Sequence, residues 1–270
     1  MIEPHLIAEL ALLGLCTGFL AGLLGIGGGM LMVPFMTLIM SHRGISGDLA
    51  VKMAIATSMA TIMFTSMASV RAHHRRGAVR WDIVKSLAPG IMLGGALASV
   101  GMFSVLKGAY LAVFFGLFVS YSATQMLRNK KPQAHRAMPG PAGQVAAGGV
   151  IGFLSGLVGA GGGFVSVPFM VSRNVPMHNA VGTSAALGFP IALANTVGYI
   201  VSGSALEGLP DGSLGYVWLP ALAVIGACSV LTAPWGAKIA HRLPVALLKR
   251  VFAVLLYCLA GYMLYKGLLA

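Results

Sequence analysis

Residues 18–36 read Gly18-Phe19-Leu20-Ala21-Gly22-Leu23-Leu24-Gly25-Ile26-Gly27-Gly28-Gly29-Met30-Leu31-Met32-Val33-Pro34-Phe35-Met36, and the chain repeats this stretch once. The second copy occupies residues 152–170, at an offset of 134 residues, and thirteen of the nineteen aligned positions are identical. In each copy an apolar run leads into three consecutive glycines, and a short apolar run broken by proline follows. The repeat indicates a chain built from two similar halves.

The composition predicts a membrane protein. Of the 270 residues 57% are hydrophobic and 9% are charged, whereas about 25% are charged in soluble domains. Several apolar runs exceed the roughly 20 residues that cross a bilayer, so we expect an all-α polytopic fold. The net charge of +12 would suggest nucleic-acid binding in a soluble protein. In a membrane protein basic residues mark cytoplasmic loops, and no nucleic-acid partner is expected.

Each half contains five apolar elements in the same order. Past the glycines, residues 54–58 match residues 180–184 at an offset of 126, and residues 87–89 match residues 218–220 at an offset of 131. The expected elements are 5–25, 30–41, 50–71, 83–104 and 108–128, followed by 144–159, 164–172, 180–203, 216–237 and 244–266. The repeats are therefore residues 1–128 and 144–270, joined by a Pro- and Gly-rich linker at 129–143.

The distribution of basic residues predicts that the two repeats are inverted in the membrane. The loop at 71–80 holds four arginines and should be cytoplasmic, whereas the equivalent loop at 203–215 has two acids and no Lys or Arg. Equivalent loops on opposite faces are typical of inverted repeats. The linker is then cytoplasmic and both termini are periplasmic. Four basic residues fall outside in this scheme: Arg43, Lys52, Lys107 and Lys266.

The second element of each repeat is too short to span the membrane. About a dozen residues make roughly 18 Å of helix, against a hydrocarbon core of ~30 Å. We therefore expect each first and second element to form a re-entrant or broken hairpin at the glycines.

The glycine blocks are the first candidate for a substrate site. Glycine lets a ligand approach the backbone, and free N–H groups at a helix start favour an anion. Non-helical backbone in a membrane is tolerated only where protein or a water-filled cavity covers it. The alternative is close helix packing, which is typical of small-x-x-x-small pairs such as Gly18 and Gly22. Because the triplet occurs twice, we favour a substrate site that contains Gly27, Gly28, Gly29, Gly161, Gly162 and Gly163.

Two hydroxyl pairs and one amide extend the candidate site. Thr57-Ser58 and Thr183-Ser184 occupy matched positions near the starts of the third elements. Their hydroxyls either face a pocket under the glycines or bond to carbonyls of their own helix, and the sequence leaves both readings open. Asn195 is a weaker candidate, and its counterpart in the first repeat is Ser69.

No catalytic residue, metal site or cofactor is expected. The three cysteines, Cys16, Cys228 and Cys258, lie in apolar runs without metal-ligand spacing. Among the six acids only Glu9 falls within an apolar run, and there only near its end. A cation pathway usually shows a buried acid or histidine, so the pattern favours an anion.

The motifs resemble those of the TauE/SafE sulfite exporter family, also called the toluene sulfonate uptake permease family. The resemblance covers nearly the whole chain and rests on the twin G-F-L-x-G-L-x-G-x-G-G-G-x-x-x-V-P-F-M blocks, each followed by an A-h-x-T-S helix start. It implies a secondary transporter of sulfur-containing organic acids or sulfite in a bacterial inner membrane. The glycines, prolines and Thr-Ser pairs are the residues that it carries over.

Together these features favour an exporter of organosulfonates or sulfite that works by alternating access around a midplane site. An anion channel is the first alternative. A membrane-embedded lipid phosphatase is the second, disfavoured because every Arg maps to a loop or a run end. The expected partners are a small anion and the lipid bilayer, and a homodimer is compatible with the sequence.

Overall fold

The computed structural model describes residues 3–24, 28–128, 137–239 and 245–269. Its elements are α1 (Pro4–Leu24), α2 (Gly29–His42), α3 (Gly47–His74), α4 (Trp81–Ala96), the π-helical turn η1 (Leu97–Met102), α5 (Phe103–Val105), α6 (Gly108–Arg128), α7 (Pro141–Val158), α8 (Gly163–Ser172), α9 (Met177–Gly203), β1 (Ser213–Leu214), β2 (Val217–Trp218), α10 (Leu219–Ile239) and α11 (Val245–Leu269).

The elements confirm the predicted class, an all-α polytopic membrane protein. Within the described residues, eight helical segments are long and apolar enough to cross a membrane. The two shorter apolar helices, α2 and α8, are those that follow the glycine blocks. Every expected apolar element is a helix within a few residues of its predicted bounds. The sequence reading missed the β1–β2 hairpin and the π-helical turn inside the fourth element.

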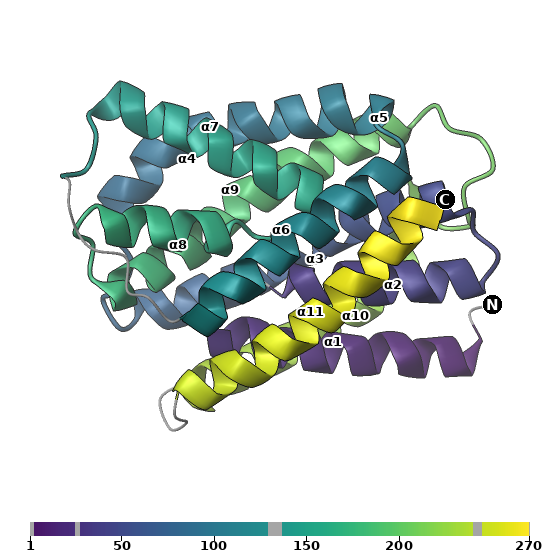
Figure 1. Cartoon of the computed structure of the whole chain (residues 1–270), viewed down its shortest axis with the longest axis horizontal. Coiled ribbons are helices and arrows are strands. Elements are labelled where there is room, and N and C mark those ends of the chain that lie inside the picture. The colour runs from purple at the N-terminus through teal and green to yellow at the C-terminus, as the bar shows by residue number, and fades with distance from the viewer. Residues whose placement is uncertain (1–2, 25–27, 129–136, 240–244, 270) are drawn as a thin grey trace.

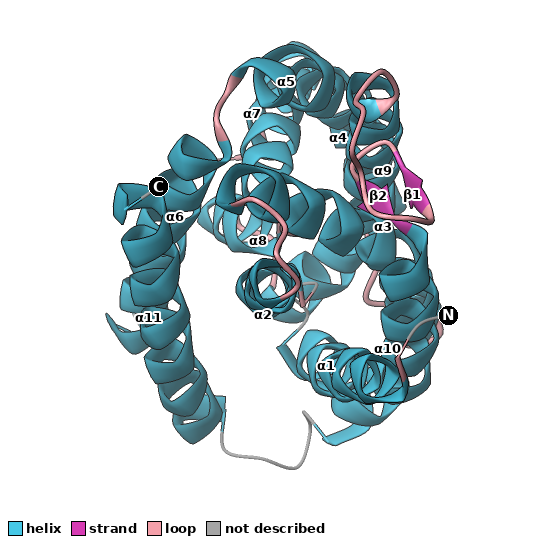
Figure 2. Ribbon diagram, turned by 90° about the vertical axis from the view of Figure 1, so that its right-hand side faces the viewer, coloured by secondary structure: helices cyan, strands magenta, loops and turns pink. Residues whose placement is uncertain are grey.

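The helices of the two repeats interlock. The first helix of each repeat packs against the fourth helix of the other, so that α1 pairs with α10 and α7 pairs with α4. The third helices, α3 and α9, pack together, as do the last helices, α6 and α11. Viewed along the bundle, α2 and α8 lie toward the middle of this arrangement (Figure 2).

The connections of the two repeats lie at opposite ends of the bundle. The loop between α3 and α4 is at the left of Figure 1, and the loop between α9 and α10 is at the right. The start of α1 and the end of α11 are also at the right-hand end. This arrangement accords with the predicted location of both termini on one face.

Glycines set the distance between the paired helices. A Cβ on Gly18 would clash with the backbone of Ser229 in α10, and a Cβ on Gly152 would clash with the carbonyl of Ile91 in α4. The small-x-x-x-small pairs therefore serve close helix packing, as their pattern indicates.

The same contacts correct the sequence alignment of the fourth helices. Gly14 packs against Ile225, and its counterpart Gly148 packs against Leu87, so the equivalent positions are 138 residues apart. The sequence match at 131 differs by seven residues, about two helical turns. A slip of two turns returns nearly to the same helix face, which explains why the residue pattern alone suggests it.

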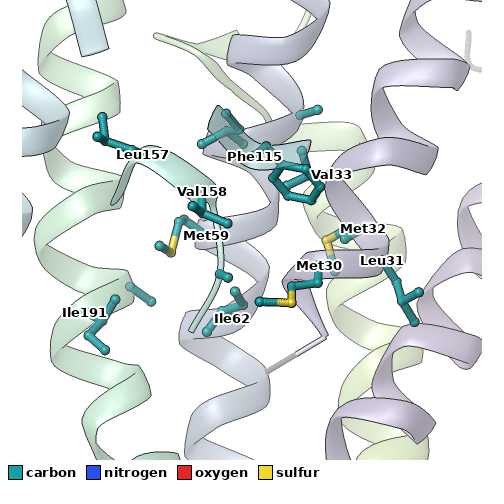
Figure 3. Packing of buried hydrophobic residues seen from close by; sticks show 14 of the residues in the cluster. Met30, Leu31, Met32, Val33, Met59, Ile62, Phe115, Leu157, Val158 and Ile191 are labelled. Atoms are coloured by element: carbon teal, nitrogen blue, oxygen red, sulfur yellow. The ribbon is translucent and has the colours of Figure 1, made fainter. Parts of the chain in front are cut away.

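A methionine-rich core surrounds the glycine blocks. Met30 and Met32 of α2, Met59 of α3 and Val158 of α7 are buried and gather where α2 meets α7 (Figure 3). Unbranched, polarisable methionine fills irregular spaces, and such spaces arise where helices start and stop inside a bundle.

The glycine interface yields a prediction on stability. Gly18→Ala should lower the free energy of unfolding by about 1–3 kcal/mol, because the new methyl group must force α1 away from α10. Gly226→Ala is the matched control in α10, since a Cβ there meets no atom within 4 Å. The control should be neutral or slightly stabilising, because alanine favours helix by about 1 kcal/mol. Melting temperatures in detergent measure both, and equal melting would contradict the packing role.

Candidate functional site

Two glycines turn the chain at the starts of the short helices. Gly28 precedes α2 with φ +61°, and Gly162 precedes α8 with φ +74°. Both conformations lie in the left-handed region, which glycine adopts without the steric cost that other residues bear. A third turn of this kind is Gly159, which ends α7 with φ +70°. These turns let the chain change direction between each short helix and the helix before it.

The two glycine blocks touch. A Cβ on Gly29 would clash with the carbonyl of Gly159 and lie 2.9 Å from Ile62 Cδ1. Ser58 of α3 donates a hydrogen bond of 3.1 Å to the same Gly159 carbonyl. The structure thus brings Gly28, Gly29 and Ser58 close to the second block. Gly27 lies outside the described residues.

The start of α8 presents free backbone donors. The N–H groups of Val165 and Ser166 both bond to the carbonyl of Gly162. The N–H groups of Gly161 and Gly163 have no acceptor among the described residues. With the positive end of the helix dipole, these donors form a local environment that suits an anion.

A small cavity lies beside Gly161. Its volume is about 20 Å³, roughly the space that one water molecule needs. It is lined by Ala21, Gly22, Ile62, Thr65, Ser66, Ser69, Gly161, Ser184, Ala185, Gly188 and Ala233. Four of these residues carry a hydroxyl group, and none of the described residues that line the cavity is charged.

Three of the four hydroxyls of the cavity make local hydrogen bonds in this conformation. Thr65 and Ser66 donate to carbonyls of their own helix, at 3.3 and 3.0 Å. Ser184 shares a hydrogen bond of 2.8 Å with Ser166 of α8. An incoming anion could receive these protons only after the hydroxyls rotate away from their present acceptors.

The two threonines of the predicted site have a different role. Thr57 Oγ1 accepts the N–H of Trp218, and Thr183 Oγ1 accepts the N–H of Arg80, both at 3.0 Å. Trp218 and Arg80 immediately precede α10 and α4. Each third helix therefore binds a backbone donor at the start of the other repeat's fourth helix. Neither of the two sequence readings, a pocket donor or a bond within the same helix, describes this contact.

Asn195 is buried between α7, α9 and α4. Its Nδ2 donates to the carbonyl of Ile191 at 2.8 Å, and its Oδ1 has no partner within the described structure. A Cβ on Gly156 or Gly95 would clash with this amide, so both glycines make room for it. Asn195 does not line the cavity, whereas its repeat counterpart Ser69 does.

The predicted residues thus fall into two groups. Gly161 and Ser184 line the cavity. The other described residues of the prediction do not line it and make contacts within the bundle instead: Gly28, Gly29, Gly162, Gly163, Thr57, Ser58, Thr183 and Asn195. Sequence reasoning missed Thr65, Ser66 and Gly188 as lining residues. The one available signal was the run of small and hydroxyl residues that continues along α3 beyond Ser58.

Comparison with known proteins identifies the family. The model of the sulfite exporter TauE/SafE family matches residues 10–263. This chain belongs to that family. The TauE/SafE match and the names of the relatives identify a membrane transporter, not an enzyme.

The relatives span nearly the same length. A probable membrane transporter protein of Haemophilus influenzae is 37% identical over 257 residues, which are 94% of this chain and 97% of that protein. A probable membrane transporter protein of Methanocaldococcus jannaschii is 26% identical over 272 residues, and the match covers 96% of this chain and 96% of that protein. The probable membrane transporter protein YunE of Bacillus subtilis is 26% identical over 96% of this chain and 97% of its own. No solved structure matches the chain.

The threonine contacts yield a prediction. Thr57→Val should destabilise the protein by about 1–3 kcal/mol, because the buried N–H of Trp218 loses its acceptor. Thr57→Ser should retain most of the stability. The control is Thr37→Val, because Thr37 is also fully buried but its hydroxyl bonds only to Val33 of its own helix. Similar melting temperatures for the two valine variants would show that the contact between the repeats contributes little.

Proposed function

We propose that this transporter carries small oxyanions, organosulfonates or sulfite, and exports them across a bacterial inner membrane. The observation that carries the proposal is the start of α8, where the N–H of Gly161 has no acceptor among the described residues and Gly161 lines a cavity with neutral hydroxyls. Backbone N–H groups and hydroxyls can all donate to the oxygens of a sulfonate or sulfite head.

The charge distribution favours an anion over a cation. Within the described structure no carboxylate lines the cavity, so nothing there would compensate a positive substrate. The helix dipole of α8 acts in the same direction, because its positive end begins two residues after Gly161, which lines the cavity. An anion that leaves a cell with a negative interior also gains about 2.3 kcal/mol per charge for each 100 mV. Export can therefore proceed without a buried proton carrier.

A carrier fits the cavity better than an open channel does. The space beside Gly161 has room for little more than one water, so a sulfonate requires a rearrangement to enter. We propose that the two repeats are inverted and that relative movement of helix groups within the bundle opens the cavity to one face at a time. The reciprocal bonds of Thr57 and Thr183 and the opposite positions of the equivalent loops support this arrangement.

Ligand binding tests the substrate class. Sulfite, sulfoacetate or taurine should raise the melting temperature of the purified protein, whereas choline should not. A ligand at 100 times its Kd stabilises the native state by about 2.7 kcal/mol. Stabilisation by choline with none by sulfonates would refute the anion site.

A pair of glycine variants tests whether α8 is the binding element. Gly162→Ala should abolish the ligand-induced shift, because the methyl group would displace Ile191 and approach Ser155 Oγ at the turn. Gly77→Ala is the control, since Gly77 has a similar φ of +66° but open space around it. Both variants bear the strain of a left-handed alanine. If the Gly162 variant melts at a lower temperature yet binds the ligand normally, the glycine block serves helix packing and not ligand binding.

Topology can be tested at two glycines with matched environments. Gly77 and Gly208 both have positive φ and open space, and they lie in the two equivalent loops. In a background without native cysteines, Gly77→Cys should react with a membrane-impermeant thiol reagent only from the cytoplasm. Gly208→Cys should react only from the periplasm. Labelling of both from the same side would exclude inverted repeats.

A further inference from the structure

Lys52 is a buried cation near the start of α3. Only 9% of its surface is exposed, and among the described residues it is the one charged residue in the buried set. The distribution of basic residues along the sequence assigns Lys52 to the outer side of the membrane, where lysine side chains are normally exposed to water. Burying an ammonium without a counter-charge costs several kcal/mol, so its surroundings need a physical explanation.

The surroundings satisfy this ammonium only in part. Lys52 Nζ makes one long hydrogen bond of 3.4 Å, to the carbonyl of Ser104. No carboxylate within the described residues lies within 4.0 Å of it. Asp48, one turn earlier on α3, instead accepts the N–H of Ala109 at 3.0 Å. The negative charge of Asp48 still acts on Lys52 from a longer distance. An ammonium has three protons to donate, and within the described residues no carboxylate accepts one of them directly.

Two aromatic rings enclose the ammonium. Its nitrogen lies 5.9 Å from the ring centre of Phe103 and 5.6 Å from that of Tyr216. The rings of Phe103 and Tyr216 pack edge to face with their centres 5.3 Å apart, and the ring centre of Phe103 lies 4.4 Å from that of Tyr199. Burial, and secondarily the charge of Asp48, raises the pKa of Tyr216, so its hydroxyl stays neutral. Cation–π attraction offsets part of the desolvation cost without supplying a negative charge.

The ring of Tyr216 is part of the β1–β2 hairpin, which covers the start of α3. It lies between β1 and β2, and Trp218 at the end of the same hairpin donates its N–H to Thr57. Lys52 and Thr57 are five residues apart on α3, or roughly 7.5 Å along the axis. The next residue is Ser58, which holds the Gly159 carbonyl. The hairpin thus covers both the ammonium and the approach from that end to the glycine blocks.

Within the described residues, the combination of a buried lysine and two aromatic rings is not repeated at the other end of the bundle. At the offset of 126 residues the counterpart of Lys52 is His178, whose side chain is exposed. At the offset of 138 the counterpart of Tyr216 is Ala78, which has no ring to offer. Since the backbone contacts repeat and these side chains do not, the buried cation serves something that differs between the two faces.

We propose that Lys52 is a binding position for the transported oxyanion at the outer end of its route, closed in this conformation by the β1–β2 hairpin. The inference rests on the proposed function and names a second residue group for it, distinct from the cavity beside Gly161. When the hairpin moves aside, the sulfonate or sulfite head becomes the direct ion-pair partner that Asp48, bound to the N–H of Ala109, does not provide. When it closes, the rings of Phe103 and Tyr216 shield the ammonium again.

The test compares three variants of the full-length protein. Lys52→Met removes the charge with little change in length, and Lys52→Arg keeps it. Lys107→Met is the control, because Lys107 is exposed and lies near the same end of the bundle. For each protein we would measure the melting temperature without ligand and the Kd values for sulfoacetate, which has two negative charges, and methanesulfonate, which has one.

We expect Lys52→Met to melt at the same temperature as the wild type or higher, because it no longer buries an unpaired charge. Its Kd for methanesulfonate should rise about tenfold or more, and its Kd for sulfoacetate should rise further. Lys52→Arg should stay within a few-fold of the wild type, and Lys107→Met should not change.

A purely structural lysine gives the opposite pattern. If Lys52 only caps the Ser104 carbonyl, Lys52→Met should melt earlier and bind both anions with unchanged Kd and an unchanged ratio. That result would overturn the role of Lys52 and leave the proposed function standing. If the wild-type protein binds neither anion, the proposed function fails and the inference fails with it.

Discussion

The structure depends on satisfying backbone groups where helices stop inside a membrane. A bilayer offers no water to an exposed carbonyl or N–H, so a break must be covered by protein. In this chain the third helices provide the cover. Ser58 binds the carbonyl at the end of α7, while Thr57 and Thr183 bind the backbone donors just before α10 and α4. The Ser58 bond satisfies a backbone carbonyl at the glycine break, and the two threonine bonds tie each third helix to the start of the other repeat's fourth helix.

Much of this architecture can be predicted from the sequence, and the features that cannot be predicted depend on tertiary contacts. Apolar runs predict the helices because a span must be continuously apolar, and tandem glycines predict turns because only glycine adopts positive φ freely. The role of Thr57 was not predictable, because a hydroxyl's acceptor or donor depends on which helix lies opposite. The β1–β2 hairpin has two residues in each strand, too few for an alternating pattern. The burial of Lys52 was not predictable either, because a lysine is normally exposed unless the tertiary structure encloses it.

The interlocked packing limits how the molecule can rearrange. Because Gly18 and Gly152 place α1 against α10 and α7 against α4 at backbone contact, these pairs cannot separate without opening large voids. A rearrangement that preserves them must move the first helix of one repeat together with the fourth helix of the other. The moving bodies would then each combine parts of both repeats. Relative displacement of these helix pairs would then occur at two places. One is the contact between α3 and α9, and the other is the set of contacts made by the short helices α2 and α8.

The repeated backbone and the unrepeated side chains have separate physical consequences. Equivalent glycines and threonines give both halves the same hydrogen-bonded frame, and such a frame by itself would favour neither direction of transport. The side chains break this equivalence. One end of α3 buries Lys52 beneath aromatic rings, whereas the matching end of α9 exposes His178 near a loop rich in arginine. On the proposed route an anion would therefore meet solvated positive charges at one end of the bundle and the buried Lys52 at the other. Salt screens the first strongly and the second weakly, so under the proposal the two ends would differ in how tightly they hold the same anion.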